Sequence, residues 1–342
     1  MLLNSDLRRK LTIGFGLGLL VVGGLVLYGD IQEIAQLMQH FRWSLVPAIL
    51  GLTIFNYILR GWRFHYYLGQ LGLKNISWWA SFRIFMGGFS LSLTPGKFGE
   101  FVRLLWLKNL VGADPAKTAP SIIVDRIVDG LAMAMLASMG AWIYPQYRLA
   151  VMLALGMMVV IVIVSQIRWL VLRVLKLGER APLISRFAHH LYNLYKSTYE
   201  LLRLKNLWIG VGIGLIAWFA QSVAFYLILI GLNVTQIPEL VLLAIFALAL
   251  SSILGGISSL PGGLGAAEAS MTGILQAVGH LSENAAVTAT LLIRFCTLWF
   301  GVIFGILTVL IWREMLFGDN GQIFDKNQVE TLESTKVKLT YE

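Results

Sequence analysis

The sequence predicts an all-α polytopic membrane protein, built as an inverted repeat of two four-element halves. Three observations lead to this fold class: the composition, the length of the apolar runs, and a motif that occurs twice. Of the 342 residues, 57% are hydrophobic and 13% are charged, whereas a soluble domain carries about 25% charged residues. Most of the uncharged runs reach the roughly 17 to 25 residues that a spanning helix needs. They lack period-two alternation, which favours helices over the strands of a membrane barrel.

We expect about six full spans and two broken or re-entrant helical pairs. The spans follow the apolar runs, at residues 11–29, 44–59, 119–144, 149–167, 207–230 and 285–312. Two further apolar regions, 78–107 and 239–279, must then each enter and leave the membrane on one side. The first run follows three basic residues, as in a signal peptide. It has no small-x-small cleavage site, so we expect a retained first helix.

The positive charges predict the orientation in the membrane. Under these spans the segments 1–10, 60–118, 168–206 and 313–342 hold 3, 8, 8 and 4 of the 27 Lys and Arg residues. Basic residues collect on the cytoplasmic side, so both termini are expected there, in a multi-pass protein of the bacterial inner membrane. Segment 168–206 reads as a basic interfacial loop, and 313–342 reads as a polar cytoplasmic tail. The net charge of +9 therefore indicates anionic headgroups, and no nucleic acid is expected as a partner.

A short motif occurs twice, as SLTPGKFGE at residues 92–100 and as SLPGGLGAAE at residues 259–268. Both copies read Pro-Gly-x-x-Gly and then Glu. A lone intramembrane arginine follows each proline, Arg126 after 31 residues and Arg294 after 33. Gly/Pro-interrupted helices in corresponding positions of two halves are typical of inverted-repeat transporters, whose sites lie where the breaks meet near the midplane.

The repeat halves are expected at residues 1–144 and 149–312. Proline removes a backbone donor and glycine permits unusual dihedrals, so the motifs should break helices. Non-helical backbone at this depth must be buried in protein or line a wet cavity. The residues expected to form the breaks are Pro95, Gly96, Gly99, Pro261, Gly262 and Gly265.

Charged residues inside the predicted spans are the candidate functional groups. Asp125, Arg126 and Asp129 interrupt an apolar run, and each costs roughly 2.5 to 3.5 kcal/mol at a helix centre. We expect pairing across the repeats between the glutamates and arginines of the motifs, with the aspartates completing the network. Such pairs either clamp helices together, bind an anionic headgroup through arginine, or relay protons. The candidate substrate-binding residues are Glu100, Arg103, Asp125, Arg126, Asp129, Glu268 and Arg294.

No cofactor or metal site is expected. The single cysteine, Cys296, permits neither an internal disulfide nor a multi-thiolate metal site. The five histidines lack the spacing of metal ligands, and no ATP-binding motif is present.

The two motif regions resemble the lysylphosphatidylglycerol synthase transmembrane, or flippase-like, family. The resemblance rests on TPGKFGEFVRLLWL with IIVDRIVDGLAM, and on SSLPGGLGAAEASMTGIL with TLLIRFCTLWFGV, and spans roughly residues 10–315. It implies a membrane domain that translocates a modified phospholipid, with Glu100, Arg126, Glu268 and Arg294 as site residues. Lys97 stands where the family has a small residue. Members can carry a fused aminoacyl-transfer domain; we expect none here, and hence no lysyl transfer.

The function predicted is a lipid flippase that moves a phospholipid or polyprenyl-linked lipid between leaflets. Its partners would be membrane lipids with anionic or phosphate-bearing headgroups, together with a second copy of the chain or an envelope-assembly protein. Two alternatives stay open. One is a membrane-embedded transferase acting on polyprenyl phosphate, and the other is a non-transporting subunit of an envelope-assembly complex. A transporter is favoured over an enzyme because neither a nucleotide-sugar domain nor a compact Asp-rich metal motif is found.

Overall fold

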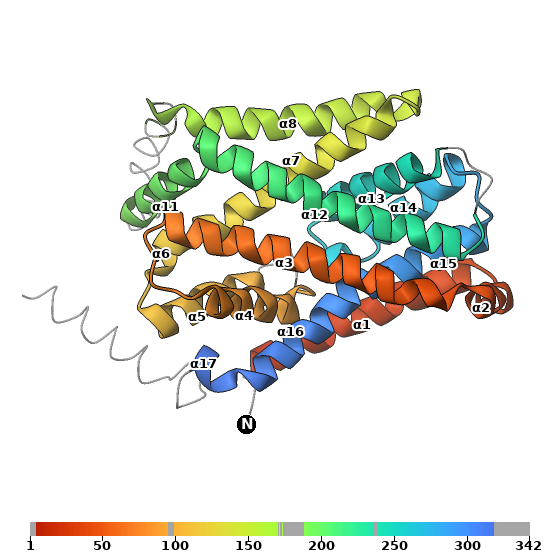
Figure 1. Ribbon diagram of the computed structural model, residues 1–342, viewed down its shortest axis with the longest axis horizontal. Helices are drawn as coiled ribbons and strands as arrows, with labels where there is room; N and C mark the ends of the chain where they lie inside the picture. Colours follow the sequence, from red (N-terminus) through yellow and green to blue (C-terminus); the bar gives the residue numbers. More distant parts are fainter. Residues whose placement is uncertain are drawn as a thin grey trace, which may run out of the picture.

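The computed structural model describes residues 5–94, 99–169, 171, 173, 188–234 and 239–317. Within these residues every regular element is a helix, which confirms the predicted all-α membrane class. Helix α8 (Arg148–Gln166) lies along the long axis of the molecule at one edge, and α1 (Ser5–Tyr28) crosses α16 (Phe300–Ile311) obliquely at the opposite side (Figure 1).

Five helical stretches in the described part are long and apolar enough to cross a membrane. They are Trp43–Gln70, Pro145–Gln166, Leu204–Gly231, Leu240–Ile257 and Glu283–Ile311. A sixth span arises if Gly18–Tyr28 and Ile31–His40 are taken as one helix bent by 97°. The predicted number of about six is therefore confirmed, but one member differs. Leu240–Ile257 lies in a region predicted as part of a broken pair, whereas the predicted span 119–144 is not among these stretches, because the helix there carries three charged residues.

The first half places two short helices around a break and a longer helix after it. Its elements are α1, α2 (Ile31–His40), α3 (Val46–Gln70), α4 (Trp78–Gly88), η2 (Phe89–Leu91), α5 (Val102–Val111), α6 (Pro115–Thr118) and α7 (Pro120–Ala141). Side-chain caps begin three of these helices. Asp30 accepts hydrogen bonds from Gln32 N and Glu33 N at 2.7 and 3.2 Å, and Ser77 accepts one from Ala80 N. Asp114 accepts a hydrogen bond from Ala116 N at 3.0 Å at the start of α6.

The second half also contains a break, at η5, with a helix on either side. It consists of α8, α11 (Ala188–Leu201), α12 (Leu204–Gly231), α13 (Leu240–Ile257), η5 (Pro261–Gly263), α14 (Ala266–Ala277), α15 (Glu283–Arg294), η6 (Phe295–Trp299) and α16. A short helix, α17 (Arg313–Phe317), follows within the predicted tail. Part of the predicted basic loop forms α11, and most of 170–187 lies outside the described residues, as does 318–342 of the predicted tail.

The halves exchange contacts reciprocally. Helix α3 packs along α12, and the two lie side by side across the middle of the molecule (Figure 1). Helix α7 of the first half packs against α13, which precedes the break of the second half. Helix α16 of the second half packs against α4 and η2, which precede the break of the first. This reciprocity is what a repeat related by a two-fold axis requires; the boundaries 1–144 and 149–312 and the inverted orientation stay predictions.

Helix α3 corrects one predicted boundary. The span was expected to end at residue 59, before Arg60, but the helix continues to Gln70. Arg60 and Arg63, which had been counted among the cytoplasmic charges, are buried inside the bundle at 5% and 0% exposure. The prediction was wrong here because buried carboxylates on a neighbouring helix compensate both charges, so the arginines do not mark the membrane surface.

We predict that Gly140→Val loosens the contact between α7 and α13. A Cβ at Gly140 would lie 2.5 Å from Phe246 Cβ, so a larger side chain must displace α13. Overpacking of this kind costs about 1 to 3 kcal/mol. Thermal unfolding of the purified protein in detergent should show a lower midpoint. Gly212→Val in α12 is the matched control, because nothing lies within 4 Å of its Cβ position. An equal fall in both variants would contradict the packing argument.

Candidate functional site

The second Pro-Gly segment breaks the helix as predicted. Gly262, Gly263 and Gly265 take positive φ angles of 61, 71 and 85°, a region that glycine adopts at little cost. The break at Pro261 separates α13 from α14, and Glu268 in the first turn of α14 accepts a hydrogen bond from Gly265 N at 2.7 Å. The carboxylate thereby closes the turn that carries it.

The first Pro-Gly segment also interrupts the helix. The Thr94 hydroxyl donates to Leu91 O at 2.8 Å and accepts from Gly99 N at 2.6 Å. A Cβ at Gly99 would come within 2.5 Å of Leu91 O, so the close approach requires glycine. The remaining predicted break residues, Pro95 and Gly96, lie with Lys97 outside the described residues.

The motif glutamates pair with the motif arginines inside each half. Glu100 forms an ion pair with Arg126, and Glu268 Oε1 lies 2.5 Å from Arg294 Nε. Both pairs join residues 26 positions apart. Arg294 Nη2 also donates to Gly262 O at 2.9 Å. The expectation of pairing across the repeats was therefore wrong, because the helix that follows each motif returns to the carboxylate of its own break.

The aspartates of α7 belong to a separate network with two arginines of α3. Arg63 Nη2 lies 2.5 Å from Asp125 Oδ1 and 2.6 Å from Asp129 Oδ1. Arg60 Nη2 lies 2.8 Å from Asp129 Oδ2, and Trp218 Nε1 of α12 donates to Asp129 Oδ1 at 3.1 Å. Two positive and two negative groups thus balance in the bundle interior. The sequence analysis did not predict Arg60 and Arg63 as site residues. The mainly apolar and aromatic residues on either side of them could have indicated that they lie inside a span.

Arg103 lies behind the first motif. Its side chain is 1% exposed, and Nη2 stands 3.5 Å from Glu100 Oε2. The guanidinium carbon lies 4.6 Å from the centre of the Phe85 ring, with the Phe64 and Phe89 rings also within cation–π range. Neither Nε nor Nη2 has a hydrogen-bond partner among the described residues.

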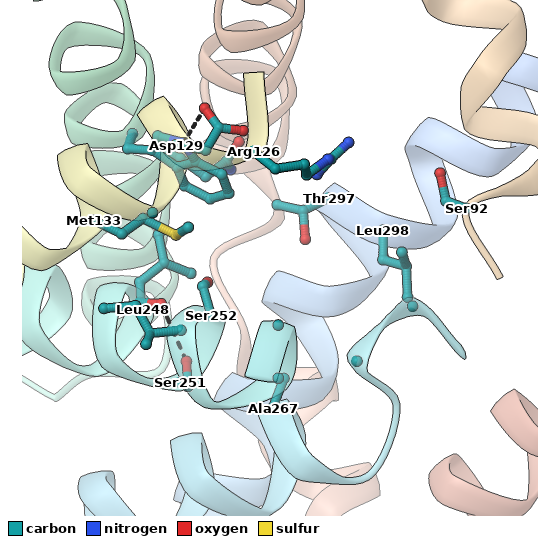
Figure 2. Close-up of a pocket in the computed structure, with 18 of the residues that line it drawn as sticks. Ser92, Arg126, Asp129, Met133, Leu248, Ser251, Ser252, Ala267, Thr297 and Leu298 are labelled. Atoms are coloured by element: carbon teal, nitrogen blue, oxygen red, sulfur yellow. Dashed lines mark hydrogen bonds between the residues drawn. The ribbon is translucent and has the colours of Figure 1, made fainter. Parts of the chain in front are cut away.

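A cavity of about 450 Å³ lies between the two broken segments, which is the size range of small-ligand sites. Of the predicted site residues, Glu100, Arg126, Asp129 and Arg294 line it, whereas Arg103, Asp125 and Glu268 support these residues from behind. Figure 2 shows Arg126 and Asp129 of α7 on one side, Ser251 and Ser252 of α13 below, and Ser92 opposite, next to Leu298. Polar lining residues that the sequence analysis missed are Asn56, Tyr57, Arg60, Ser92, Trp218, Gln221, Ser251, Ser252, Ser259 and Thr297.

A π-helical turn, η6, follows Arg294 directly and brings Thr297 and Leu298 to the cavity. The Tyr57 hydroxyl of α3 donates to Thr297 O at 2.6 Å, which ties this turn to the first half. Single π-turns inside α-helices occur frequently at functional sites. The π-turn therefore determines which residues after Arg294 line the cavity, namely Thr297 and Leu298.

Both cavity arginines keep donors available. Within the described part of the chain, Arg126 bonds Glu100 through Nη2, and its Nε and Nη1 donate no hydrogen bond. Arg294 uses Nε and Nη2 and keeps Nη1. Guanidinium groups suit phosphate and carboxylate oxygens, and such charge-assisted bonds are about twice as strong as neutral ones. The described residues contain no group of three or more His, Cys, Asp or Glu that could hold a metal ion.

Comparison with known proteins gives one matching family. The family model described as the lysylphosphatidylglycerol synthase TM region matches residues 15–305. A UPF0104 membrane protein of Methanothermobacter thermautotrophicus is 22% identical over 283 residues, covering 78% of this chain and 83% of the relative. A UPF0104 membrane protein of Methanocaldococcus jannaschii is 21% identical over 226 residues, covering 66% of this chain and 95% of the relative.

We predict that Arg63→Leu destabilises the bundle strongly. Removing this side chain leaves two buried carboxylates with Arg60 alone, and breaking a buried ion pair costs about 3 to 5 kcal/mol. Thermal unfolding in detergent is the measurement. Arg203→Leu is the matched control, because its ion pair with Glu200 is solvent-exposed and worth at most about 1 kcal/mol. If Arg63→Leu unfolds at the same temperature as Arg203→Leu, the network does not hold α3 to α7.

Proposed function

Because this chain belongs to the lysylphosphatidylglycerol synthase transmembrane family, matched over residues 15–305, we propose that it moves a phosphate-bearing lipid between the leaflets of its membrane. The lipid is a phospholipid or a polyprenyl-linked lipid. We further propose a bacterial inner membrane as its location. The bias of positive charges, which remains without the buried Arg60 and Arg63, supports cytoplasmic termini.

The convergence of Arg126 and Arg294 on one cavity carries this proposal. The arginines come from equivalent places after the two breaks, and both line the same space. Each is held by a buried carboxylate on its own break and keeps at least one free donor among the described residues. Two guanidinium groups facing one cavity favour an anionic ligand, and a phosphate is the anion common to membrane lipids.

The size and walls of the cavity support a headgroup site rather than a site for a whole lipid. A volume of about 450 Å³ suits a headgroup, so the hydrocarbon tails must remain in the bilayer. Two apolar lining residues at the end of α13 and beside it, Ile257 and Leu260, are 58% and 45% exposed. The Arg126 side chain is 33% exposed. A polar site bordered by exposed apolar residues lets a headgroup enter while its tails stay in lipid.

The test is lipid transfer in proteoliposomes that contain fluorescent phospholipids, with the outer-leaflet fluorophore reduced chemically. We predict that the wild type speeds transfer above empty vesicles. Arg126→Gln and Arg294→Gln should each slow transfer by about tenfold or more, because each loses a charge-assisted bond to phosphate. Arg203→Gln, at the exposed pair with Glu200, should transfer at the wild-type rate.

Equal rates in all four proteins and in empty vesicles would contradict a transporter. In that case, turnover of polyprenyl phosphate by purified protein with divalent metal would favour a membrane transferase. Loss of transfer in Arg203→Gln as well would contradict a specific role for the cavity arginines. Unfolding midpoints of each variant separate loss of transfer from loss of fold.

A further inference from the structure

The charges that line the cavity, or contact its charged lining residues, do not cancel. Among the described residues these are five arginines and four carboxylates, which leaves one net positive charge. Seven of the nine are buried, while the Arg126 and Arg294 side chains are 33% and 17% exposed. The arginines are Arg60, Arg63, Arg103, Arg126 and Arg294, and the carboxylates are Glu100, Asp125, Asp129 and Glu268. The excess is shared by buried Arg103 and partly exposed Arg126. Water therefore compensates it only in part, and an anionic ligand that neutralises it gains free energy.

The excess charge lies at the first break. The network between α3 and α7 is neutral, with Arg60 and Arg63 against two aspartates. The pair at the second break is also neutral. At the first break two arginines, Arg103 and Arg126, share the carboxylate of Glu100, at 3.5 Å from Arg103 Nη2 and in a direct hydrogen bond from Arg126.

The two repeats differ at one position, and this difference creates the excess. Three residues after the motif glutamate, the first copy has Arg103 and the second has Met271. Met271 lines the cavity, whereas Arg103 does not. Arg103 therefore acts on the cavity through Glu100: it takes up part of the negative charge that would otherwise compensate Arg126.

Arg126 is also the more available of the two cavity arginines. Its side chain is 33% exposed, against 17% for Arg294. Among the described residues it donates one hydrogen bond, while Arg294 donates two. The excess positive charge and the free hydrogen-bond donors thus both lie at Arg126.

We propose that the cavity selects lipids whose headgroup carries one net negative charge, with Arg126 binding the anionic oxygens and Arg103 acting as the positioning residue that sets this preference. The inference rests on the proposed function, since it names the class of lipid that the same site takes. Phosphatidylglycerol, a phosphodiester with an uncharged small headgroup, has this chemistry. Phosphatidylcholine carries the same phosphodiester with a compensating cation.

The experiment measures binding of these two lipids, with identical acyl chains, to the purified full chain by native mass spectrometry. The wild type should prefer phosphatidylglycerol by about tenfold or more, the size of one charge-assisted bond. Arg103→Met copies the residue of the second repeat and makes the charges around the cavity cancel. It should reduce the preference to within about twofold, although the residue does not line the cavity. Arg103→Lys keeps the charge and should keep the preference.

Arg83→Gln is the matched control. Arg83 stacks on Trp312, 4.7 Å from the ring centre, and is not among the cavity-lining residues, so its loss removes one positive charge without changing the site. This variant should retain the wild-type preference. Arg103→Met should fold, because an ion with unpartnered buried nitrogens can be replaced by an apolar side chain of similar volume at little cost; its unfolding midpoint checks this.

A wild type without preference, or an Arg103→Met variant that keeps it, would overturn the inference. If Arg103→Met does not fold, the comparison of Arg103→Lys and Arg126→Gln decides instead: preference kept in the first and lost in the second supports the inference, and any other pattern opposes it. Transfer in proteoliposomes without lipid preference would leave the proposed function standing and refute the selectivity. Selective binding without transfer would support the selectivity and contradict the proposed transport.

Discussion

The cost of burying charge in a membrane bundle is the constraint on which this structure depends. Among the described residues, nine charged side chains lie in or beside the cavity, seven of them buried, and every one contacts a group of opposite charge. These contacts join parts of the chain that are far apart in sequence. Arg60 and Arg63 tie α3 to α7 through two aspartates, and Trp218 brings α12 to the same carboxylate. Removing one partner leaves the other exposed to a low dielectric, so the network fixes how these helices pack.

The same constraint explains why the breaks stand where they do. A spanning helix has no spare donor for a carboxylate, but a broken one exposes backbone groups and allows a side chain to turn inward. Glu268 accepts from Gly265 N and pairs with Arg294, which in turn donates to Gly262 O. Break, carboxylate and arginine form one closed unit whose arginine lines the cavity. The first half builds a similar unit from Glu100 and Arg126, with Arg103 added to it.

The helix breaks and the charged residues of the site could be predicted from the sequence, whereas the ion-pair partner of each charged residue could not. The break at Pro261 and the glycines with positive φ follow from residue chemistry, so the motif located them. The arginines after each motif were found because isolated charges in apolar runs are conspicuous. The sequence predicted that each glutamate pairs with the arginine of the other repeat. In the structure each arginine pairs with the glutamate of its own break.

The end of α3 and the residues that line the cavity could not be predicted, because both depend on how distant helices pack together. Arg60 resembled the end of a span, and only the position of Asp129 on another helix reveals it as internal. Lining residues such as Asn56, Gln221 and Ser252 come from three helices and share no motif. Their common place depends on how α3, α12 and α13 pack, which no single segment encodes.

A structure of the protein in lipid nanodiscs that contain phosphatidylglycerol would test the central claim most directly. We expect phosphate density in the cavity, at about 2.7 to 2.9 Å from the free nitrogens of Arg126, with the acyl chains leaving past Leu260. A cavity without lipid density, with phosphates only at the outer ends of the helices, would contradict it.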